Sequence, residues 1–158
     1  ELVVINPGGV FGPPLGKNIS GQTMSIVDQM LRGKMPMVPN AAFPMADVRD
    51  VAMLHVQAMT LPEAKGLRVV VASDGPLGFA QVAQILIDDG YKGPSTRIAP
   101  SSLLRFLSLF DREAKGMIGF LGMKLGADNS RTRELFGWTP TPLEQSVRET
   151  AAAVQAMR

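Results

Sequence analysis

The stretch that decides the fold comes first: Glu1-Leu-Val-Val-Ile-Asn-Pro-Gly-Gly-Val-Phe-Gly-Pro13. Residues 2–5 are apolar at every position instead of every second one, which is typical of a strand covered on both faces in a parallel sheet. A Pro/Gly-rich loop follows directly. Because the strand begins without a lead-in or an initiator methionine, we expect further polypeptide before Glu1 and further strands after it.

Composition restricts the class of protein before any motif is considered. The chain has 158 residues, of which 46% are hydrophobic and 19% are charged, as in an ordinary globular domain. The longest uncharged stretch, residues 2–16, is interrupted by prolines and glycines and is shorter than the roughly 18 apolar residues of a membrane-spanning helix. No secretory signal pattern is present, and the lack of cysteine suits a reducing compartment. We therefore expect a cytoplasmic protein without membrane contact.

Charge and metal-ligand content argue against two further classes of function. The net charge is only +2, and most basic residues are interleaved with acidic ones, so we expect no nucleic-acid surface. His55 is the single histidine, and neither a second histidine nor a dense carboxylate cluster completes a metal site. Since His55 falls on the apolar stripe of a predicted helix, we interpret it as a hydrogen-bonded core residue.

The spacing of apolar residues predicts alternating strands and helices. One helix should end at Gly33, a second should begin at Asp47, and a third should end at Gly90, with an irregular Pro-rich segment over residues 35–44. The β-branched run 68–73 predicts a second buried strand. This alternation favours a parallel sheet. The predicted core face of the second helix consists of Val48, Val51, Ala52, His55, Val56 and Met59.

The last third of the sequence is predicted to be helical. Residues 101–115 have an apolar surface too wide for one small core, so we expect another part of the protein to cover it. Trp138 is the expected packing anchor after a short helix. For the final helix we predict Thr141 as N-cap, with Glu144 as its capping-box partner.

Four segments then show a family resemblance: 6–13 (Asn-Pro-Gly-Gly-Val-Phe-Gly-Pro), 31–33 (Leu-Arg-Gly), 47–58 (Asp-Val-Arg-Asp-Val-Ala, then His-Val-Gln-Ala) and 135–140 (Leu-Phe-Gly-Trp-Thr-Pro). In order and spacing they resemble the C-terminal half of the extended short-chain dehydrogenase/reductases, in the NAD-dependent epimerase/dehydratase superfamily. Within it they look most like the dihydroflavonol reductase-like and aldehyde reductase-like branch.

The resemblance implies an α/β fold: the C-terminal portion of a Rossmann-type doubly wound parallel sheet plus a small, mostly helical substrate-binding subdomain. Residues 1–34 and 47–90 would supply sheet and helix elements. Residues 35–46 and 91–158 would form the substrate-binding region. The N-terminal cofactor-binding half of the family would be absent from the chain.

The family's site residues transfer to a few positions. The backbone of Pro7, Gly8, Gly9 and Val10 would lie beside the nicotinamide of NADP, where the glycines allow a close approach. Ser20 is the candidate near the adenosine phosphate, with Thr23 and Ser25 as alternatives in the same stretch. The wall of the substrate pocket would include Phe43, Met45 and residues 106–120, although these residues could equally be core between helices. For Asp50, a helix-capping or inter-domain role is favoured over catalysis, and Asp47 and Arg49 share that interpretation.

The chain also departs from the family pattern. It has neither the Gly-rich phosphate loop nor a Tyr-x-x-x-Lys pair, because glycines 8–12 run into Pro13-Pro14 and the only tyrosine, Tyr91, is followed at the fourth position by Ser95. We assign no catalytic residue. We expect this chain to bind cofactor weakly, to be inactive alone and to self-associate through exposed apolar faces. Together with a missing N-terminal half, it would act on a small carbonyl substrate. The alternatives are a stand-alone non-catalytic ligand-binding or regulatory module and the corresponding part of a sugar-nucleotide epimerase.

Overall fold

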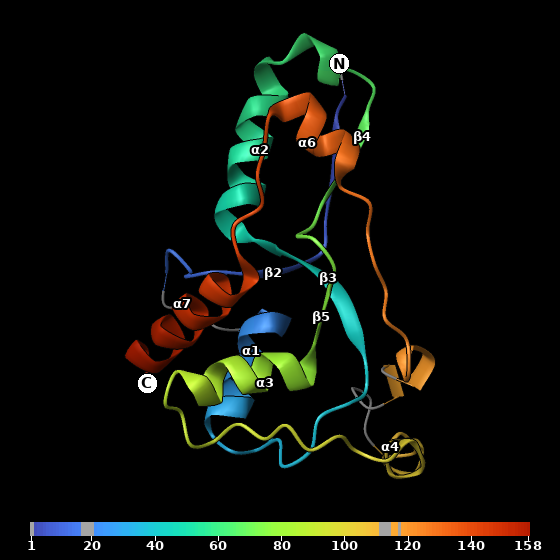
Figure 1. Cartoon of the computed structure of the whole chain (residues 1–158), viewed down its shortest axis with the longest axis vertical. Coiled ribbons are helices and arrows are strands. Elements are labelled where there is room, and N and C mark those ends of the chain that lie inside the picture. Colours follow the sequence, from blue (N-terminus) through green and yellow to red (C-terminus); the bar gives the residue numbers. More distant parts are fainter. Residues whose placement is uncertain (1, 17–20, 111–114, 117) are drawn as a thin grey trace.

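The computed structural model describes residues 2–16, 21–110, 115–116 and 118–158, which are arranged around two small sheets (Figure 1). Strands β1 (Val4–Pro7) and β4 (Arg68–Val71) form a parallel pair with Ile5 opposite Val69. In the second sheet β3 (Ala42–Asp47) is central, parallel to β2 (Gly9–Phe11) and antiparallel to β5 (Pro76–Gly78). The predicted α/β class and the predicted strand over 68–73 are confirmed.

The helices fall into two groups (Figure 1). The helices are α1 (Gln22–Leu31), α2 (Val48–Thr60), α3 (Phe79–Asp88), α4 (Ser101–Leu107), α6 (Ser130–Phe136) and α7 (Leu143–Ala156), with 3-10 turns η1 (Pro62–Ala64) and η2 (Ile118–Phe120). Helices α2 and α6 pack beside β1 and β4, α1, α3 and α7 pack around the three-stranded sheet, and α4 lies apart from both groups. Gly33 and Gly90 have positive φ angles of 67° and 90° just after their helices, so both predicted helix ends are confirmed.

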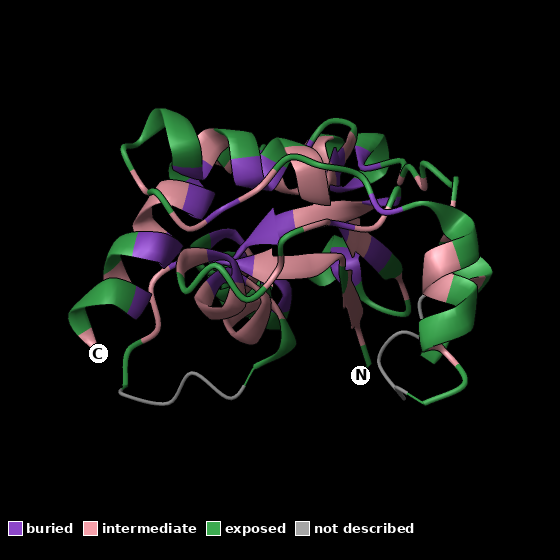
Figure 2. Cartoon of the chain, turned by 90° about the horizontal axis from the view of Figure 1, so that it is seen from below, coloured by how far each residue is buried: buried purple, intermediate pink, exposed green. Residues whose placement is uncertain are grey.

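The buried side chains form two clusters. Figure 2 colours the buried positions purple, and they occur in both helices and strands. The larger cluster joins α1, α3 and α7 through fully buried residues such as Met30, Leu86 and Val154. Burial of each such side chain stabilises the fold by roughly 1.5–3 kcal/mol relative to exposure. The smaller cluster holds Leu54 and Trp138 between α2 and the parallel pair, so the prediction of Trp138 as a packing anchor is confirmed.

Strand β3 lies partly where the sequence predicted an irregular segment. Its residues 42–44 pair with β5, which ends at Gly78, and its residues 45–47 pair with β2. Prolines make this segment look irregular locally. Partners that are distant in the sequence nevertheless hold it as the central strand.

The predicted core face of α2 is wrong. The helix buries Asp50, Leu54 and Ala58, whereas Val56 is 64% exposed and Met59 is 83% exposed. Of the predicted stripe, Val51 packs against the cluster of β1 and β4 side chains, whereas the other members lie exposed. These short strands cover only a narrow arc of the helix.

Two other apolar segments are poorly covered in this chain. In β1, Val4 and Ile5 are only partly buried, and Leu2 before them is 71% exposed, so the expected burial on both faces is not found in this chain. Phe110, after α4, is 81% exposed. None of the helices that the structure describes is long and apolar enough to cross a membrane.

Candidate functional site

The candidate site is the loop in which β1 continues into β2. The exposed residue Pro7 ends β1, and the backbone N–H of Gly8 donates to the carbonyl oxygen of Val71 at 3.0 Å, which extends the parallel pair by one residue. A Cβ atom on Gly8 would overlap the carbonyl oxygen of Pro44, and one on Gly9 would lie 2.5 Å from the Met45 sulfur. Gly8 is therefore required by the close approach of the β3 backbone, whereas a Cβ on Gly9 would meet only the flexible Met45 side chain. This is a reason that the sequence did not reveal.

The structure brings the predicted cofactor-side and substrate-side residues together across β2 and β3. Gly9 lies opposite Met45, and Val10 lies opposite Ala46. Phe43 lies on the same face of β3 as Met45. Its ring packs edge to face against the rings of Phe79 and Phe120, with centroid separations of 6.3 Å and 5.4 Å. Ser20 lies outside the described residues. The binding roles of these residues remain predictions.

A buried carboxylate fixes the far end of β3. Asp47 has no exposed surface and caps α2 by accepting a hydrogen bond from the Arg49 backbone N–H at 2.8 Å. Two further bonds come from the Arg49 guanidinium at 2.8 Å, and Ser146 Oγ donates at 2.6 Å. Burial alone would raise the pKa of Asp47, but the hydrogen bonds from Arg49 and Ser146 outweigh it and lower the pKa. The predicted N-cap at Asp47 is confirmed.

Asp50 joins α2 to the segment before α7. Its carboxylate accepts from the backbone N–H and from the hydroxyl of Thr141, both at 2.8 Å. Asp50 therefore caps neither helix but ties α2 to the segment before α7. The predicted capping box at Thr141 is wrong, because the Thr141 hydroxyl is bound to Asp50 and Glu144 pairs with Arg148 at 2.8 Å instead.

Two contacts that join α7 to the candidate site were not predicted from the sequence. Thr150 Oγ1 accepts a hydrogen bond from the Gly12 backbone N–H at 2.7 Å, and Ser146 reaches Asp47 as described above. Both residues are fully buried. The available signal was their spacing, because these two hydroxyl residues lie one helical turn apart beside the apolar stripe of α7.

His55 has no partner that suggests chemistry. Its Nδ1 lies 2.7 Å from the Val51 carbonyl oxygen, as expected for a hydrogen-bonded histidine, but the side chain is exposed and not in the core. Within the described ranges, no three His, Cys, Asp or Glu side chains are grouped so that they could hold a metal ion.

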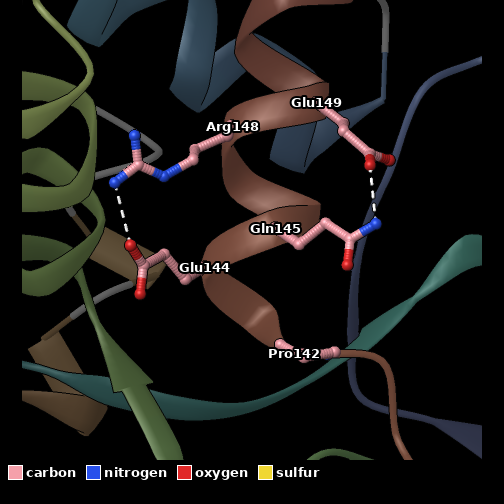
Figure 3. Close-up of a pocket in the computed structure, with 5 residues that line it drawn as sticks. All are labelled: Pro142, Glu144, Gln145, Arg148 and Glu149. Atoms are coloured by element: carbon pink, nitrogen blue, oxygen red, sulfur yellow. Dashed lines mark hydrogen bonds and ion pairs between the residues drawn. The ribbon is translucent and has the colours of Figure 1, made fainter.

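A hollow on the surface of α7 is lined by residues of the start of that helix alone (Figure 3). Its polar side chains bind one another: Arg148 to Glu144 and Gln145 to Glu149, both at 2.8 Å. The hollow adjoins the far end of β3, because Glu149 in its lining also pairs with Arg49 at 2.7 Å. We do not assign it a ligand.

Comparisons with known proteins place this geometry in a family. The chain is 31% identical over 161 residues to the ketoreductase azaE of Aspergillus niger, covering 98% of this chain and 43% of that protein. It is 35% identical over 86 residues to cinnamoyl-CoA reductase 1 of Arabidopsis thaliana, covering 54% of this chain and 24% of the reductase. The chain is related to the extended short-chain dehydrogenase/reductases. No family model matches it.

Solved structures agree with this relationship. The Gre2–NADPH complex from Candida albicans superimposes with a TM-score of 0.68 at 28% identity, over 98% of this chain and 44% of Gre2. UDP-glucuronic acid 4-epimerase from Bacillus cereus shares the fold, with a TM-score of 0.68 at 13% identity, 99% coverage of this chain and 46% of the epimerase. The superfamily and the Rossmann-type fold predicted from the sequence are therefore confirmed. The chain spans less than half of the length of the curated relatives it matches, and the match lies in their C-terminal half.

Proposed function

We infer that this chain forms the nicotinamide-side loop and part of the substrate-pocket wall of an NAD(P)H-dependent carbonyl reductase, and that it is inactive alone. The observation that carries this proposal is the close approach of Gly8 and Gly9 to Pro44 and Met45, which brings β2 and β3 together. The similarity to a ketoreductase and to an NADPH complex supports the reductase over an epimerase.

The fit to a nicotinamide can be judged from the loop itself. Pro7 ends β1 at the carboxyl end of a parallel strand pair, where open α/β sheets bind ligands. Because the Gly8 N–H is bound to Val71 and Pro7 has no N–H, carboxamide binding would use the carbonyl of Pro7 and the backbone of Gly9 and Val10. The bound cofactor would supply a hydride to the carbonyl carbon. The chain's own residues would orient the ring and shield it from water.

The exposed apolar stripe of α2 supports a partner. Val56 and Met59 are largely exposed although their spacing is that of a buried helix face. We propose that the other half of a reductase covers this face and supplies the phosphate loop and the proton donor. In its absence, copies of this chain would associate through the same face.

The decisive experiment is enzymatic. The gene is read upstream of Glu1 for a Gly-rich loop and Tyr-x-x-x-Lys, and the complete product is assayed with NADPH and aldehydes, ketones and nucleotide sugars. We expect carbonyl reduction by the complete product and negligible NADPH oxidation by residues 1–158. A start codon directly before Glu1 would contradict the proposal in favour of a stand-alone binding module, and turnover of nucleotide sugars alone would favour an epimerase.

A further inference from the structure

Helix α7 holds the backbone directly after β2, the strand that follows the candidate cofactor loop, through one hydroxyl group. Thr150 Oγ1 accepts from the Gly12 backbone N–H at 2.7 Å and donates to the Ser146 carbonyl oxygen at 2.6 Å. The Thr150 proton and one of its lone pairs are both used, and the residue is fully buried. This contact joins residues that lie 138 positions apart in the sequence.

Ser146, one turn earlier, holds the neighbouring strand. Its Oγ donates to Asp47 Oδ2 at 2.6 Å, and Asp47 lies opposite Phe11 in the β2–β3 register. Helix α7 is therefore bonded to both strands of the site, to β2 through Gly12 and to β3 through Asp47.

Gly12 has little freedom to find another arrangement. Its φ angle is +130°, which favours glycine, and a Cβ atom would lie 2.5 Å from Val48 Cγ1. Its N–H is buried with the Thr150 hydroxyl as acceptor. Since an unpaired buried N–H is costly, loss of this hydroxyl should shift or loosen the backbone around Gly12.

We propose that Thr150, assisted by Ser146, is a positioning residue that sets the Pro7–Val10 backbone for the nicotinamide cofactor. The proposal rests on the proposed function of that loop. Thr150 does not contact the cofactor; it acts through Gly12 and β2. The affinity for cofactor is thus controlled from the C-terminal helix, by side chains that belong to no cofactor motif of the sequence.

The test uses the complete reductase and begins with the wild type. Hydrogen–deuterium exchange is measured with and without NADPH, and we expect NADPH to protect residues 7–12. If it does not, the proposed function of the loop fails, whatever Thr150 does. Thr150→Val, Thr150→Ser and the control Thr132→Val are then compared. Thr132 is a matched control because it is also buried and donates at 2.6 Å to the Val70 carbonyl oxygen, which belongs to β4 opposite Asn6, so it tests whether the route through Gly12 and β2 is specific.

For Thr150→Val we expect faster amide exchange over residues 8–12 and an increase of about tenfold in Kd and KM for NADPH, with kcat at saturating cofactor nearly unchanged. Thr150→Ser, which keeps the hydroxyl, should behave as the wild type. Thr132→Val should lower the melting temperature and leave Kd unchanged.

Three results would overturn the positioning role. One is wild-type exchange and Kd in Thr150→Val. The second is faster amide exchange over residues 8–12 in Thr150→Val with an unchanged Kd for NADPH, given that NADPH protects residues 7–12 in the wild type. The third is an equal rise of Kd in Thr132→Val. If circular dichroism shows that Thr150→Val is unfolded, Thr150→Ala, which introduces no new contact, is judged by the same measurements.

Discussion

Replacing Asp47 with alanine should destabilise the chain by about 3 kcal/mol. The carboxylate caps α2, and loss of an N-cap costs about 1 kcal/mol. The hydrogen bond from Ser146 Oγ at 2.6 Å is buried and should contribute about 1 kcal/mol, since Ser146 retains only a longer contact to the Pro142 carbonyl oxygen at 3.4 Å. The Arg49 side chain is 46% exposed, so solvent screening limits its ion pair with Asp47 to roughly 1 kcal/mol.

Asp47→Asn separates charge from capping. Asparagine can still accept from the Arg49 backbone N–H, but it carries no charge and turns an amide donor toward Arg49 or Ser146. We expect a loss of about half that of the alanine variant, roughly 1.5 kcal/mol. The assay is equilibrium urea unfolding of residues 1–158, with Asp88→Asn as the control. Asp88 is an exposed residue of α3, where a change should stay within about 0.5 kcal/mol.

Two outcomes would refute this reasoning. Equal unfolding midpoints for Asp47→Ala and Asp88→Asn would mean that the cluster contributes nothing. Wild-type stability of Asp47→Asn would mean that the charge of Asp47 contributes nothing. The capping hydrogen bond and the side-chain volume, both kept by asparagine, would then account for its whole contribution. In the melting temperature, the alanine variant should lose roughly 6–12 °C for a domain of this size.

Three other predictions concern pH, backbone packing and association. The pKa of Asp47 is lowered in the folded chain, so on acidification the unfolded chain takes up the proton first. The free energy of unfolding should therefore fall as the pH drops below about 4. Urea midpoints measured between pH 3 and pH 6 should decline less steeply for Asp47→Asn than for the wild type. Gly8→Ala should cost about 2 kcal/mol because its Cβ overlaps the Pro44 carbonyl oxygen, whereas Gly16→Ala, which has no atom within 4 Å of the added Cβ, should unfold like the wild type; an unaltered melting temperature of Gly8→Ala would contradict the packing argument. The isolated chain should self-associate, and Val56→Glu with Met59→Glu should shift it toward monomer in sedimentation, whereas a rigid wild-type monomer would exclude association through α2.

The sequence predicted the features that depend on nearby residues. Gly33 and Gly90 end helices through their own backbone conformation, and Asp47 caps α2 by bonding two residues ahead. The strand at 68–71 follows from a β-branched run. In each case the residues that make the pattern also make the structure.

Features built from distant partners could not be predicted in this way. Strand β3 forms only by pairing with β2 and β5. The hydrogen bond from Gly12 to Thr150 of α7 joins residues 138 positions apart. At the site, the sequence predicted that Gly8 and Gly9 allow a close approach of the nicotinamide, and this stays a prediction. The sequence could not show that the approaching group includes the backbone of Pro44 on β3.

The wrong predictions of burial share one physical explanation. Helix α2 has two apolar arcs: one, with Leu54 and Ala58, packs in this chain, and the other, with Val56 and Met59, lies exposed. Strand β1 beside it is paired within the described residues only with β4, and its side chains are only partly buried. A hydrophobic pattern predicts that a face of a helix or strand is buried, but it does not indicate which polypeptide covers that face. Since the relative azaE is more than twice as long as the matched part, we expect the second arc of α2 and the open side of β1 to be covered together, by the polypeptide that such relatives have beyond the match.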